Sequence, residues 1–109
     1  MHILVVDDES LARQRLIRLL GELEGHAVVG EAGNGEQAIA AVEEFDPDLV
    51  LMDVRMPGID GIDAAKVIAD LDEPPAIIFC TAYDEYALEA FEAQAVGYLV
   101  KPVQQEKLV

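Results

Sequence analysis

The chain has 109 residues, 52% of them hydrophobic, and a formal net charge of −15 at pH 7. This length and apolar share suit one compact domain with a single core and leave no room for a second domain. No apolar run reaches the roughly 18 residues of a membrane span, and the amino terminus lacks a secretory signal pattern, so we expect a soluble, cytoplasmic protein without a membrane partner.

The charge balance and the cysteine content exclude further classes of function. Twenty-two acidic residues stand against seven basic ones, which argues against direct nucleic-acid binding by this chain. The single cysteine, Cys80, cannot form an internal disulfide and has no companions at metal-ligand spacing. Most of the acidic residues are expected to lie on a solvated surface, so only the acids at predicted strand ends bear on function.

Apolar runs and segments of helical period alternate along the chain. Runs without polar alternation, typical of strands buried on both faces, occur at residues 3–6, 27–29, 49–52, 76–80 and 98–100. Between them, apolar residues recur at helical spacing over residues 12–23, 38–45, 65–71 and 87–91. This order predicts an α/β fold with a doubly wound, five-stranded parallel sheet, helices on both faces and right-handed crossovers.

Polar residues suited to N-caps precede the predicted helices. Asn34, followed by Gln37 three residues later, resembles a capping box, and Ser10, Asp60 and Asp84 are also suitable N-caps. These signals support the same division into strands and helices.

Chemically active side chains follow the predicted strands. Asp7 and Asp8 come after the first strand, Asp53 after the third, Thr81 at the end of the fourth and Lys101 after the fifth. In open parallel sheets the ligand site lies beyond the carboxyl ends of the strands, so all of these side chains are expected at one edge. The carboxylates would repel one another there unless a cation neutralised them.

A hard divalent cation is the natural partner for such an edge. Mg²⁺, with Mn²⁺ as a substitute, prefers oxygen ligands and accepts one or two carboxylates together with water and phosphate oxygens, so Asp7 or Asp8 with Asp53 would suffice. A carboxylate held in this way is a nucleophile toward phosphorus, and Asp53 is the candidate. The sequence therefore predicts a magnesium-dependent phosphoacceptor site.

Three further residues have roles in this hypothesis. The Lys101 ammonium would balance charge on the transferred phosphoryl oxygens, and the Thr81 hydroxyl would donate to one of them. Tyr98 would move together with Thr81, so that the two residues form a switch. Taken singly, each residue also has an ordinary structural explanation: a helix cap for Asp8, a strand-end hydroxyl for Thr81 and a surface ammonium for Lys101.

Two other functions use similar residues. A phosphatase of the haloacid dehalogenase type also combines a strand-end Asp with Thr or Ser, Lys and Mg²⁺, but it carries a second Asp two residues after the nucleophile, where this chain has Arg55. An interaction module that is never phosphorylated is the other alternative. Against it stands the joint presence of all the proposed site residues, Asp7, Asp8, Asp53, Thr81 and Lys101.

The order of these residues resembles the receiver domain of bacterial two-component response regulators (CheY-like) over essentially the whole chain. The resemblance is carried by ILVVDDE at residues 3–9, DLVLMDVRMPGIDG at 48–61, the TAYDEYALEAF stretch from Thr81 and GYLVKP at 97–102. It implies that Asp53 accepts a phosphoryl group from a sensor histidine kinase, that Asp7 and Asp8 serve the Mg²⁺ site, and that the backbone carbonyl of Arg55 completes it. Such a domain is a signalling module, not an enzyme acting on other substrates.

The stretch from Thr81, followed by AVGYLVKP, is similar to the LytR/AlgR subgroup, whose receivers are usually joined to a LytTR-type DNA-binding domain. The resemblance thus implies that the output is transcription, through an effector domain outside this chain. Receivers normally close with a fifth full helix, but only residues 104–109 remain here. We therefore expect a receiver domain over residues 1–109 that is truncated near the start of its last helix. The apolar seam exposed in this way should either make the chain less stable than a version extended through the helix or allow it to pair as a homodimer.

Overall fold

The structure is a computed structural model of the whole chain, and it describes residues 1–81 and 97–100. In these ranges the chain alternates strands and helices. The elements are β1 (His2–Val6), α1 (Ser10–Gly21), β2 (Ala27–Ala32), α2 (Gly35–Phe45), β3 (Leu49–Met52), α3 (Gly61–Ala69), β4 (Ala76–Thr81) and β5 (Gly97–Val100). The predicted helix at residues 87–91 and the predicted truncated last helix lie outside the described residues.

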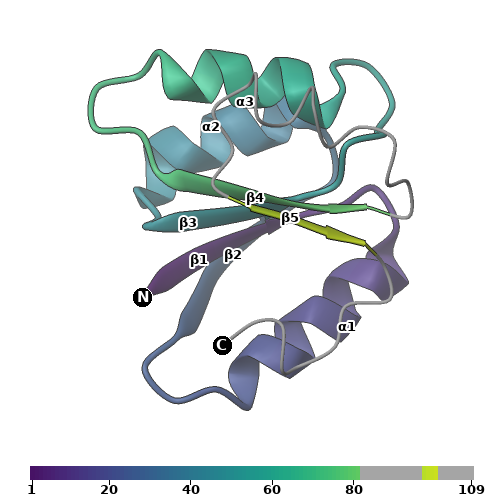
Figure 1. Cartoon of the computed structure of the whole chain (residues 1–109), viewed down its shortest axis with the longest axis vertical. Helices are drawn as coiled ribbons and strands as arrows, with labels where there is room; N and C mark the ends of the chain where they lie inside the picture. The colour runs from purple at the N-terminus through teal and green to yellow at the C-terminus, as the bar shows by residue number, and fades with distance from the viewer. Residues whose placement is uncertain (82–96, 101–109) are drawn as a thin grey trace.

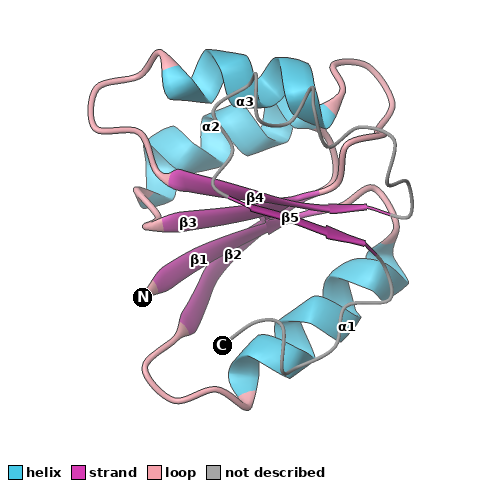
Figure 2. Cartoon of the chain, in the orientation of Figure 1, coloured by secondary structure: helices cyan, strands magenta, loops and turns pink. Residues whose placement is uncertain are grey.

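The strands form one parallel sheet in the order β2-β1-β3-β4-β5. The first strand, β1, lies second in the sheet, with β2 on one side of it and β3, β4 and β5 on the other. Helix α1 covers one face of the sheet, while α2 and α3 cover the other (Figure 1). Colouring by secondary structure shows the same three layers of helix, sheet and helix (Figure 2). The predicted parallel α/β fold with helices on both faces is confirmed.

The sheet separates two hydrophobic clusters. On the side of α2 and α3, alternate strand residues such as Leu4, Val50 and Phe79 pack with the apolar faces of these two helices. On the other side, Ile3, Leu51 and their neighbours pack against Leu16 and Leu20 of α1. Because strands β1, β3 and β4 contribute to both clusters, their sequences are continuously apolar, as expected for buried parallel strands.

The structure confirms two of the predicted N-caps and contradicts a third. Asn34 accepts a hydrogen bond from the Gln37 amide at 2.8 Å, and Asp60 accepts one from Asp63 at 2.8 Å, so both predicted N-caps are confirmed. Ser10 is wrong as an N-cap: it is the first helical residue, and Glu9 occupies the cap position without a side-chain cap. Asp84 lies outside the described residues.

Strand β2 is longer than the apolar run that predicted it, because it continues through Gly30 and Glu31 to Ala32. It is the outer neighbour of β1 in the sheet, and its Glu31 side chain is exposed, so polar residues are tolerated there. Among the helices that the structure describes, none is long and apolar enough to span a membrane.

Candidate functional site

Asp7 and Asp53 are brought side by side by the hydrogen bonding of the sheet. The register between β1 and β3 pairs Val6 with Met52, and the next residue on each strand is an aspartate. The Asp53 amide donates to the Val6 carbonyl at 3.0 Å, and the Asp7 amide donates to the Ala32 carbonyl at 3.1 Å. The parallel ladder therefore extends to the two acids and fixes their backbones at the carboxyl edge.

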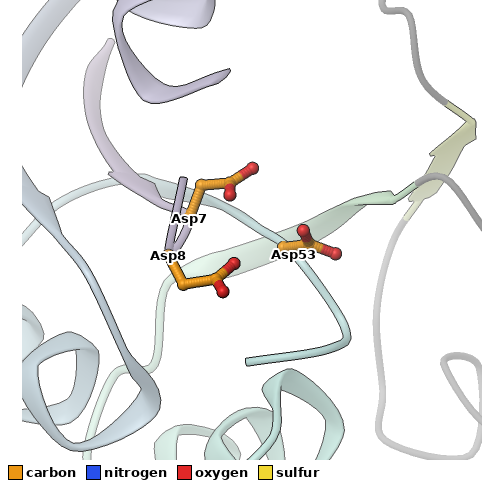
Figure 3. Close-up of side chains that lie close together, drawn as sticks. All are labelled: Asp7, Asp8 and Asp53. Atoms are coloured by element: carbon orange, nitrogen blue, oxygen red, sulfur yellow. The ribbon is translucent and has the colours of Figure 1, made fainter. Parts of the chain in front are cut away.

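Asp8 completes a cluster of three carboxylates. One oxygen from each of Asp7, Asp8 and Asp53 lies within 4.8 Å of the other two, and all three side chains project to the same side of the strand ends (Figure 3). Asp7 is 1% exposed and Asp53 7% exposed, whereas Asp8 faces solvent. The Glu9 amide donates to Asp7 Oδ1 at 2.9 Å, which holds that carboxylate in place.

The donor set fits a small, hard cation. Two buried carboxylates and a third beside them are a costly grouping of like charge unless a positive ion lies between them. Ligands of one Mg²⁺ ion, each at about 2.1 Å, are at most about 4.2 Å apart. The separation of up to 4.8 Å needs only a small side-chain rotation to meet this limit. The arrangement therefore suits Mg²⁺ with water in the open positions.

An open depression adjoins the acidic cluster on the side of the β3–α3 loop. Its volume is about 490 Å³, and it is lined by Asp8, Arg55, Asp60 and the intervening residues Val54, Met56 and Pro57. The depression is open to solvent and has room for a group the size of phosphate. It also places Arg55, the predicted source of a backbone ligand, on the same side as the exposed carboxylate of Asp8.

The loop after Asp53 is packed directly against the start of α3. The Gly61 amide donates to the Val54 carbonyl at 2.6 Å. A Cβ atom at residue 61 would overlap the Asp53 carbonyl oxygen and would lie 3.0 Å from both the Asp53 carbonyl carbon and the Val54 Cα. Only glycine allows this close approach, so the start of α3 packs directly against the backbone of Asp53 and Val54.

The remaining predicted site residues lie on the neighbouring strands or beyond them. Thr81 ends β4 and is fully buried. It pairs with Val100 of β5, and Phe79 pairs with Tyr98. Thr81 and the backbone of Tyr98 are thus placed on strands that continue the sheet beside β3, while Lys101 lies outside the described residues.

Sequence reasoning missed two residues that shape the site. Arg13 of α1 reaches back to the Asp7 carbonyl, with its Nη1 atom 2.6 Å from that oxygen. No local pattern indicates this contact, because it depends on how α1 packs on the sheet. Gly61 had a local signal: a glycine just inside a helix start has poor helix propensity and often marks a close backbone approach.

Comparison with known proteins agrees with the geometry. A family model described as the response regulator receiver domain matches residues 3–109. The positive alginate biosynthesis regulatory protein of Pseudomonas aeruginosa is 55% identical over 109 residues, covering 99% of this chain and 44% of that protein. The sensory transduction protein LytT of Bacillus subtilis is 44% identical over 108 residues, covering 99% and 45%.

A solved structure shows the same fold. A chain in the crystal structure of the CheX–CheY–BeF₃–Mg²⁺ complex from Borrelia burgdorferi superimposes with a TM-score of 0.90 at 25% identity, covering 99% of this chain and 83% of that one. This chain spans a little under half the length of the two curated relatives. On the family match, the sequence identity and the shared fold, the chain belongs to the receiver domain family of two-component response regulators.

Proposed function

We propose that this chain is a phosphoacceptor receiver, which takes a phosphoryl group from a phosphohistidine of a sensor histidine kinase onto Asp53. The observation that supports this most directly is the cluster of Asp7, Asp8 and Asp53, with oxygens within 4.8 Å of one another at the carboxyl edge of the sheet. Asp53 is the proposed nucleophile: it directly follows β3, which lies between β1 and β4 in the sheet, and the resemblance to receiver domains assigns the phosphoryl group to this position. The family identity makes phosphoryl transfer the chemistry to test first.

Mg²⁺ is the proposed cofactor, and Mn²⁺ its substitute. Asp7, Asp8, Asp53 and the backbone carbonyl of Arg55 would hold it. When bound, the ion neutralises charge on the carboxylates and on the transferred phosphoryl oxygens. The structure of the CheX–CheY complex, which shares this fold, was solved with BeF₃ and Mg²⁺, and this supports the assignment. Water would fill the positions that the protein leaves open.

The transfer itself requires one bond to form and one to break. An Asp53 carboxylate oxygen attacks phosphorus, the bond from phosphorus to the donor imidazole nitrogen breaks, and the imidazole leaves with the bonding electron pair. Lys101 is proposed to balance charge on the phosphoryl oxygens together with the metal. By this step the chain would promote its own phosphorylation; for dephosphorylation, water would attack phosphorus and the Asp53 carboxylate would leave. No other substrate is proposed.

The fold proposed for this function is the five-stranded receiver fold. We propose that this domain is one part of a larger regulator. The curated relatives are more than twice as long as the aligned region, and their names describe regulation and sensory transduction. We propose that phosphorylation controls a LytTR-type DNA-binding effector domain in a cytoplasmic parent protein, and that homodimerisation accompanies this output. The net charge of −15 supports DNA contact through the effector domain and not through this chain.

The proposed output depends on a switch formed by Thr81 and Tyr98. The Thr81 hydroxyl would donate a charge-assisted hydrogen bond to the aspartyl phosphate. This bond would favour the conformation in which Thr81 and Tyr98 have moved over the conformation of the unphosphorylated chain. We expect phosphorylation to shift the NMR signals of residues 83–98 as well as those around Asp53, and Thr81→Ala to suppress the distant shifts. Shifts confined to the surroundings of Asp53 in the unmutated chain would contradict the switch.

Intact-mass measurement tests the proposed function. After incubation with acetyl phosphate or phosphoramidate and Mg²⁺, the chain should gain the mass of one phosphoryl group, and excess EDTA should prevent the gain. The phosphatase alternative predicts hydrolysis of phosphate esters with turnover, and the unphosphorylated interaction module predicts no mass gain under any condition. Labelling that proceeds undiminished in EDTA would rule out the metal-dependent mechanism.

A further inference from the structure

Arg13 links the acidic site to the edge of the sheet. It lies in the first turn of α1, and its side chain is 19% exposed. The guanidinium makes two contacts with different elements: Nη1 donates to the Asp7 carbonyl oxygen at 2.6 Å, and Nε donates to Glu31 Oε1 of β2 at 2.9 Å. A rigid, planar group thus joins the loop that carries Asp7 and Asp8 to strand β2.

The contact falls on the peptide unit that joins two of the three acids. The Asp7 carbonyl and the Asp8 amide belong to one planar peptide group. A hydrogen bond that fixes the carbonyl therefore also fixes the orientation of the Asp8 amide and the position of the Asp8 Cα. Asp7 has further restraints from Ala32 and Glu9, but the Asp8 side chain is exposed. The position of Asp8 is therefore more dependent on the Arg13 contact than that of Asp7.

We propose that Arg13 is a positioning residue of the metal site: it holds the Asp7–Asp8 peptide so that both carboxylates converge with Asp53 on the ion. The inference rests on the proposed function, because it concerns how the same site is assembled. Arg13 does not touch the ion or the phosphoryl group in this role. Glu31 orients the guanidinium and offsets its charge.

A purely electrostatic role for Arg13 makes the opposite prediction. A cation near a metal site repels the metal, so removing it without other change would tighten Mg²⁺ binding. Loss of a positioning contact weakens binding instead, because the ligands must then be ordered when the ion arrives; groups that hold metal ligands in place typically contribute about 10-fold or more in affinity. The direction of the change in Mg²⁺ affinity separates the two roles.

The test is isothermal titration of the 109-residue chain with MgCl₂. Arg13→Ala should raise the Kd for Mg²⁺ about 10-fold, the lower end of the range for such supporting groups. Arg18→Ala is the matched control: it removes the same charge from an exposed position in the last turn of the same helix and should leave the Kd unchanged. An unchanged or lower Kd for Arg13→Ala would overturn the proposal.

Two conservative variants keep the test decisive if Arg13→Ala folds poorly, as judged by circular dichroism and thermal melting in EDTA. Arg13→Lys keeps the charge but lacks the planar fork, and should still raise the Kd. Glu31→Gln keeps an acceptor for Nε and removes only charge, so it should leave the Kd nearly unchanged. If the Mg²⁺ affinity of these variants changes only with their net charge, the positioning role of Arg13 is contradicted.

The outcomes for the unmutated chain separate this inference from the proposed function. If the unmutated chain neither binds Mg²⁺ nor gains a phosphoryl group, the proposed function fails. If it does both, and Arg13→Ala matches it, only the positioning role fails. Asp7→Asn serves as the reference for a damaged site, since it removes a proposed ligand directly.

Discussion

Asp53→Asn is expected to lose all labelling by acetyl phosphate, to the level of a sample without donor. The amide has nearly the shape of the carboxylate, but it is neutral and a much weaker nucleophile toward phosphorus. Because the side chain keeps its shape and the backbone at residue 53 is held by the Val6 carbonyl, the substitution should leave the fold intact. Intact-mass measurement over a time course with Mg²⁺ gives the result.

Two controls make this prediction specific. Asp63→Asn changes an exposed acid of α3 that lies outside the acidic cluster, and it should be labelled like the unmutated chain. Melting of Asp53→Asn in EDTA should occur at the same temperature as the unmutated chain or higher, since one of three clustered charges has been removed. Equal labelling of Asp53→Asn would place the acceptor at another residue and refute the assignment.

Gly61→Ala is expected to destabilise the chain by about 3 kcal/mol or more, at the upper end of the usual cost of overpacking. The new Cβ would overlap the Asp53 carbonyl oxygen, and the contact is with backbone on both sides, so no side-chain rotation relieves it. Either α3 shifts or the loop after β3 shifts. Equilibrium urea unfolding measures the loss of stability.

The same substitution should also slow phosphorylation of the molecules that remain folded. A displacement of about 1 Å at a reacting group can reduce a rate roughly 100-fold. Gly21→Ala is the matched control, because a Cβ at residue 21 meets nothing within 4 Å at the end of α1. That variant should be neutral or slightly more stable. If Gly61→Ala leaves the free energy of unfolding unchanged, the contact between residue 61 and the Asp53 backbone does not require glycine, and the prediction is wrong.

The fold was predictable from the sequence wherever burial alone determines residue type. Strands β1, β3 and β4 are buried on both faces, so their apolar runs marked their positions to within a residue. Strand β2 was predicted three residues too short, because Gly30 and Glu31 interrupt the apolar run at the outer side of the sheet. Its length depends on hydrogen bonding with β1, which is not visible in composition.

The site was partly predictable for a related reason. Asp7 and Asp53 each follow an apolar strand directly, and the carboxyl ends of parallel strands share one edge, so their neighbourhood followed from the order of elements. Ser10 was misjudged as a cap because the sequence does not show which residue has the last non-helical dihedral angles. Glu9 takes that position, and its amide bonds to Asp7 instead.

The sequence by itself determined the alternation of strands and helices, the acids at the strand ends and the resemblance to receiver domains, because each of these depends on local residue type and order. Only the tertiary structure decided that three carboxylate oxygens lie within 4.8 Å, that Gly61 touches the backbone of Asp53, and that Arg13 bridges Asp7 and Glu31. These contacts join segments that are brought together by strand register and helix packing. No pattern within one segment encodes the distance between two of them.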